Sequence, residues 1–72
     1  MNENETRTII GNYHIYVSEA YDALERLQNF MNDPKFQNLV QDKDPKVSNL
    51  LEEENVFVQS FKMFLNDLND AF

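Results

Sequence analysis

The chain has 72 residues, of which 13 are acidic and 6 are basic, so its formal net charge at pH 7 is −7. This acidity argues against direct binding to nucleic acid or to an anionic membrane, because both are bound through Lys and Arg. With no Cys and one His, disulfides, thiolate zinc sites and two-histidine metal motifs are excluded. We therefore expect no cofactor, no metal and no small-molecule substrate.

The first predicted element is a long helix over residues 5–32, which follows a disordered start at residues 1–4. Apolar residues recur there at alternating spacings of three and four, the period of an α-helix. They are Ile10, Tyr13, Val17, Ala20, Leu24, Leu27 and Met31. A neighbouring column, also apolar, consists of Ile9, Tyr16, Ala23 and Phe30. The apolar stripe is thus wider than the seam of a two-stranded coiled coil.

Two Asp-Pro pairs, Asp33-Pro34 and Asp44-Pro45, predict where the next helices begin. Asp is a favourable N-cap, and Pro suits the first helical position. We expect a short helix over residues 34–41 and a second long helix over residues 45–72. The apolar columns of the last helix contain Val47, Leu50, Leu51, Phe57, Val58, Phe61, Phe64, Leu65, Leu68, Ala71 and Phe72.

The predicted fold is all-α, with residues 1–72 forming a single domain. It is an antiparallel hairpin of two long helices with a short helix in the connection. Such a hairpin should place Met31 opposite Val47, and Ile10 opposite Leu68. If Phe61 is central to the core, Phe61→Ala would cost about 3–5 kcal/mol.

Both long helices offer more apolar surface than they can bury against each other. The simplest closure is dimerisation into a four-helix bundle, since two-fold dimers are the commonest oligomers. The alternative is a helix of another protein in the groove. The expected protein interface consists of Tyr13, Tyr16, Tyr21, Glu54, Val56, Phe57, Phe61, Met63 and Phe64.

Three of these residues admit two interpretations. Glu54 lies at a seam position, where it would either fix register or partner choice, or reach water because the hairpin widens. Val56 and Met63 lie one heptad apart outside the main stripe. They form either a second, smaller contact surface or scattered apolar residues of the kind every protein surface has.

Carboxylates are abundant, as in Glu52-Glu53-Glu54, but general acid–base chemistry needs two of them converging in a cleft. A thin hairpin has no cleft, so we expect that the protein is not an enzyme. The segment Asp42-Lys43-Asp44 lacks the Gly and the closing Glu of a calcium-binding loop.

The sequence therefore favours a non-catalytic protein–protein interaction module, an acidic helical regulator or adaptor. One alternative is an acidic inhibitor or antirepressor that mimics nucleic acid and binds a DNA-binding protein; the other is a co-chaperone of a secretion system. In size and pattern the chain is similar to small helical regulators of phages and mobile elements, and to small helical secretion co-chaperones. Its polar, acidic start predicts a cytoplasmic location.

Overall fold

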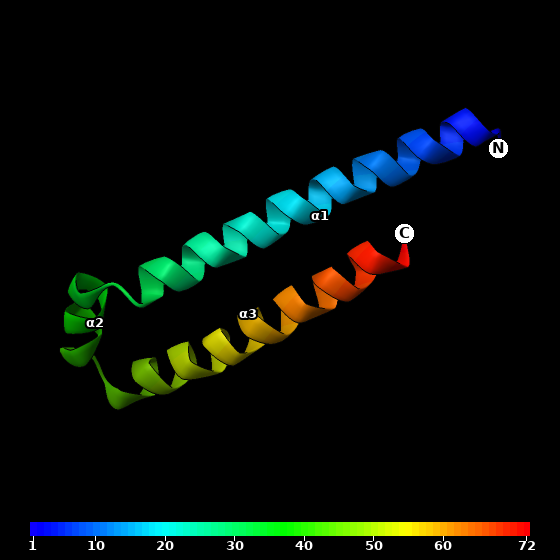
Figure 1. Ribbon diagram of the computed structural model, residues 1–72. Coiled ribbons are helices and arrows are strands. Elements are labelled where there is room, and N and C mark those ends of the chain that lie inside the picture. The colour runs from blue at the N-terminus through cyan, green and yellow to red at the C-terminus, as the bar shows by residue number, and fades with distance from the viewer.

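The computed structural model describes residues 1–72 and contains three helices, α1 (Glu3–Met31), α2 (Pro34–Gln41) and α3 (Pro45–Ala71). The all-helical class predicted from the sequence is confirmed, and no strand is present. α1 and α3 run antiparallel, and α2 lies at the turn between them (Figure 1).

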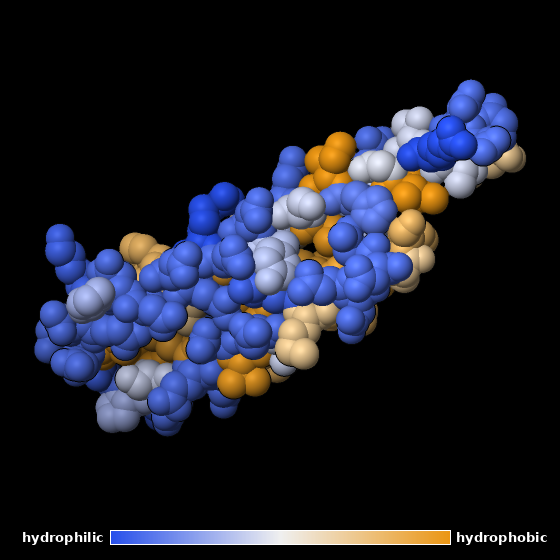
Figure 2. Space-filling model, in the orientation of Figure 1, coloured by the Kyte–Doolittle hydropathy of each residue, from blue (hydrophilic) through white to orange (hydrophobic).

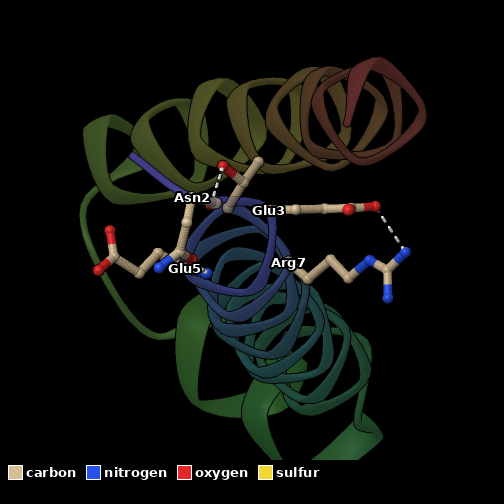
Figure 3. A network of polar contacts seen from close by, with 5 residues as sticks. Asn2, Glu3, Glu5 and Arg7 are labelled. Atoms are coloured by element: carbon tan, nitrogen blue, oxygen red, sulfur yellow. Dashed lines mark hydrogen bonds and ion pairs between the residues drawn. The ribbon is translucent and has the colours of Figure 1, made fainter.

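α1 begins at Glu3, so part of the segment expected to be disordered is helical. The cause is local capping chemistry that the sequence interpretation overlooked. Asn2 is the N-cap, and its Oδ1 accepts a hydrogen bond from the backbone N–H of Glu5 at 2.8 Å. Arg7 pairs with Glu3 one turn earlier at 2.8 Å (Figure 3). The carboxylates of this first turn also interact favourably with the positive end of the helix dipole.

The other two helices begin at the predicted Asp-Pro pairs. The carboxylate of Asp33 accepts from the backbone N–H of Lys35 at 2.9 Å, and Asp44 accepts from that of Lys46 at the same distance. In both helices Pro occupies the first turn, where its missing N–H leaves no bond unmade. Short-range chemistry thus suffices to place both helix starts.

The core lies along the seam between the helices and is thin. The buried apolar residues are Val17, Met31, Val40, Val58 and Leu65. Phe61 does not lie at the core centre, because the residue is 49% exposed. α3 is rotated so that Val58 and Leu65 face α1. These smaller side chains permit a closer approach of two helices than a column of Phe rings does.

The register of the hairpin also differs from the predicted one. Tyr13 packs against Phe72, with ring centroids 4.9 Å apart, and His14 is hydrogen-bonded to Asn69. Gln28 donates to Gln59 at 3.3 Å. The expected pairings of Met31 with Val47 and of Ile10 with Leu68 are therefore wrong, by about two helical turns.

The reason for the shifted register is the position of α2. Phe36 of α2 packs on Phe30 with centroids 5.1 Å apart, and Gln37 donates to the carbonyl of Met31. α2 thus takes the place beside the start of α3 that the end of α1 was expected to fill. Val40 is buried there and lines a crevice with Leu51.

Because of this shift, the start of α1 projects beyond the end of α3 (Figure 1). We call residues 3–12 the overhang; they precede Tyr13, which packs on the last residue of the chain. The whole molecule is a rod with extents of 57 × 18 × 14 Å and a radius of gyration of 17.0 Å. A compact chain of this length would have a radius of gyration of about 11 Å.

Candidate protein-binding surface

One side of the seam is an open, apolar groove with a volume of about 530 Å³. Its lining consists of Leu24, Phe57, Val58, Ser60, Phe61 and Phe64. Ser60 is the one polar residue among them. Leu24 comes from α1 and the others from α3, so the groove runs between the two helices.

The apolar surface continues along both helices beyond the groove. On α1, Ala20 and Leu27 lie four residues before and three after Leu24, which places them on the same side of the helix. We call this surface the apolar face; its exposed members are Tyr16, Ala20, Ala23, Leu27 and Phe30 of α1, and Leu50, Phe57, Phe61 and Phe64 of α3. None of these residues carries a charge, but the half-buried Glu54 lies between Leu50 and Phe57 on the same side of α3 and is a carboxylate within the face.

Charged residues border the apolar face. Glu53 and Asp67 lie in the α3 column beside Phe57 and Phe64, three or four residues away, and both are exposed. On α1, Glu19 lies three residues after Tyr16 and is also exposed. The apolar face therefore has a largely acidic rim, which keeps its edges hydrated.

The opposite side of the seam is closed by polar side chains. Lys62 is buried, with 9% of its surface exposed. Its Nζ donates to Oε1 of Gln28 at 2.9 Å and lies 3.6 Å from the carboxylate of Glu25. The same ammonium lies 4.9 Å from the ring centroid of Tyr21, a cation–π contact. All three partners are on α1, so this cluster ties α3 to α1.

Sequence reasoning missed Lys62, although a signal for it exists. Lys62 lies four residues after Val58 and three before Leu65, so it shares their side of α3. A basic residue at this spacing in a seam requires an acceptor on the facing helix. Gln28 and Glu25 lie three residues apart on α1 and supply it.

Further along this polar side lies a small crevice of about 150 Å³, lined mainly by polar residues. The residues are Val17, Ser18, Tyr21, Asp22, Asn66 and Asn69. Figure 2 shows a face of the rod that is mostly hydrophilic, with hydrophobic groups confined to the seam and the margins. The two sides of the hairpin therefore differ sharply in character.

The structure distributes the nine residues of the expected interface over several places. Phe57, Phe61 and Phe64 meet in the groove. Tyr21 lies on the polar side under Lys62, and Tyr13 lies at the end of α3 against Phe72. The other four are exposed, except for the half-buried Glu54: they are Tyr16, Glu54, Val56 and Met63.

No group of three His, Asp or Glu side chains is placed to hold a metal ion. A search of the helices for a membrane-crossing segment finds none that combines the required length and apolarity. Comparisons with protein-family models, with curated proteins and with solved structures find no match.

Proposed function

We propose that this chain is a non-catalytic protein-binding module, an acidic regulator or adaptor, which acts by binding a helical surface through its apolar face. The observation that carries this proposal is the exposure of the large aromatic side chains there. Phe57 is 75% exposed and Tyr16 is 69% exposed. Association with another apolar surface would remove these rings from water, which is the main driving force of most protein–protein contacts.

The amount of exposed surface supports a second copy of the chain as the occupant. The accessible surface is 5863 Å². A compact monomer of 8.5 kDa would expose about 4,700 Å². The excess of about 1,200 Å² exceeds the roughly 800 Å² that each partner buries in a standard interface. Two hairpins packed apolar face to apolar face would form a four-helix bundle with two-fold symmetry.

In that dimer the apolar face becomes the core and the polar sides become the outer surface. The Lys62 cluster already satisfies the polar groups of the outer side within each hairpin. The chain carries a net charge of −7, so the dimer presents an acidic exterior to any further partner. The overhang and the turn with α2 form its two ends.

Sedimentation equilibrium of the pure protein tests this proposal, with Phe64→Lys as the disrupting variant. We expect twice the monomer mass for the wild type, and a dissociation constant raised about 30-fold or more by Phe64→Lys, the effect of losing a central anchor residue. Asn66→Lys is the matched control, because it adds the same charge in the polar crevice of the same helix. A folded monomer at high concentration would contradict the dimer.

The same preparations distinguish the two alternatives. A salt-sensitive complex with a basic DNA-binding protein, lost when Glu52→Lys and Glu53→Lys are combined, would favour the acidic inhibitor over the dimer. Poor folding of the isolated chain, corrected by coexpression with a second protein, would favour the co-chaperone.

A further inference from the structure

We propose that two copies pack with their α2 turns at opposite ends of the four-helix bundle, so that the overhang of each copy covers the turn of the other. This inference rests on the dimer proposed above and adds its orientation. In this arrangement the two-fold axis crosses the helices at right angles. α1 then packs on α1 of the other copy, and α3 packs on α3.

The pattern of side-chain sizes on the apolar face fits one such axis. On α1 the middle of the face is small, with Ala20 and Ala23, whereas larger side chains lie towards both ends. An axis midway between these alanines pairs Ala20 of one copy with Ala23 of the other, which allows the two α1 helices to approach closely. The same axis brings Tyr16 opposite Leu27 of the other copy.

The same axis also suits α3. An axis midway between Phe57 and Phe64 pairs Phe57 of one copy with Phe64 of the other, and it places Phe61 next to the axis. For one axis to serve both helices, the two midpoints must lie at the same level of the hairpin. Lys62, beside the α3 midpoint, contacts Tyr21, Glu25 and Gln28 of α1, so the two midpoints lie within about one helical turn of each other.

The overhang supplies a second, independent reason. It carries the exposed Ile9, which lies two turns before Tyr16 and continues the apolar face of α1 as far as Glu5. With turns at the same end, both overhangs, about 15 Å long, would project beyond the α3 helices. With turns at opposite ends, each overhang lies over the turn region of the other copy, where Leu39 and Leu50 are 54% and 64% exposed.

Spin-label distance measurements test the orientation, and the absence of Cys in the chain makes single labels straightforward. Lys43→Cys labels the turn and Asn4→Cys labels the overhang; both positions are exposed, and Asn4 lies on the side of α1 that faces away from Ile9. We expect two Lys43→Cys labels in one dimer to be separated by nearly the 57 Å length of the rod. A mixture of the two labelled variants should add a short distance, below roughly 25 Å, about two helix diameters.

The outcomes separate this inference from the dimer itself. A short distance between two Lys43→Cys labels, with the dimer mass unchanged, would overturn the orientation and leave the dimer intact. A monomer mass with no label–label distance would contradict the dimer, and the orientation with it. The unlabelled variants should sediment as the wild type does, which verifies that the substitutions leave association unchanged.

Discussion

The two sides of the seam between α1 and α3 are formed by the same pair of helices but differ in how far their side chains are paired or buried within one chain. On the polar side, Lys62 reaches Gln28 and Glu25 and covers the ring of Tyr21, so the surface is complete within one chain. On the apolar side, Phe57, Phe61 and Phe64 line an open groove. One side is closed by the chain itself, and the other leaves aromatic side chains open to water.

This difference follows from the kinds of interaction involved. A hydrogen bond or ion pair needs one partner, and a facing helix can supply it. A Phe ring needs neighbours on all sides before it leaves water, and a layer of two helices supplies them on one side only. A hairpin can therefore satisfy its polar residues alone, but it cannot bury a wide aromatic stripe.

The largest expected effect is in the seam. Leu65 is 7% exposed, so Leu65→Ala should lower the free energy of unfolding by about 2–5 kcal/mol, as is typical for truncation of a buried Leu. Phe61→Ala should cost less in dilute protein, and its cost should grow with protein concentration, because Phe61 would be buried further in the proposed dimer. Urea unfolding of both variants over a range of concentrations measures the difference. Equal losses in dilute protein would show that α3 is rotated as the sequence predicted.

A medium effect is expected on the polar side. Gln28→Leu removes the acceptor of the buried ammonium of Lys62 and should cost about 1–3 kcal/mol of unfolding free energy. Lys62→Met removes the charge itself and should leave the stability unchanged or raise it, because its former partners remain partly hydrated. Thermal unfolding at fixed protein concentration compares the two. A larger loss for Lys62→Met would mean that the ammonium contributes net stability to the seam.

The smallest effect is expected at the start of α3, which belongs to neither side of the seam. Asp44 caps α3 by accepting from the N–H of Lys46, so Asp44→Ala should lower the stability by about 1 kcal/mol. Asp42→Ala is the control, since it removes the same charge from the same turn without removing an N-cap. Circular dichroism during thermal unfolding should show a lower melting temperature for Asp44→Ala alone. If both variants melt alike, charge and not capping sets the effect.

The candidate surface was predictable only in part. Apolar spacing identified the aromatic columns of both helices and indicated more apolar surface than the hairpin can bury. It did not identify which column faces the other helix, because Val58 and Phe61 lie on adjoining parts of α3 and both fit the period. It also grouped Tyr21 with the aromatic surface, although Tyr21 lies beneath Lys62 on the other side.

The sequence by itself determined the helical class, the Asp-Pro starts of α2 and α3, and the width of the apolar stripes. Capping and periodicity act over one or two turns, so they can be read from neighbouring residues. Only the tertiary structure decided the rotation of α3, the register of the hairpin and the burial of Lys62. Each of these depends on which side chains fit together across two helices that are far apart in the chain, and local spacing carries no information about that fit.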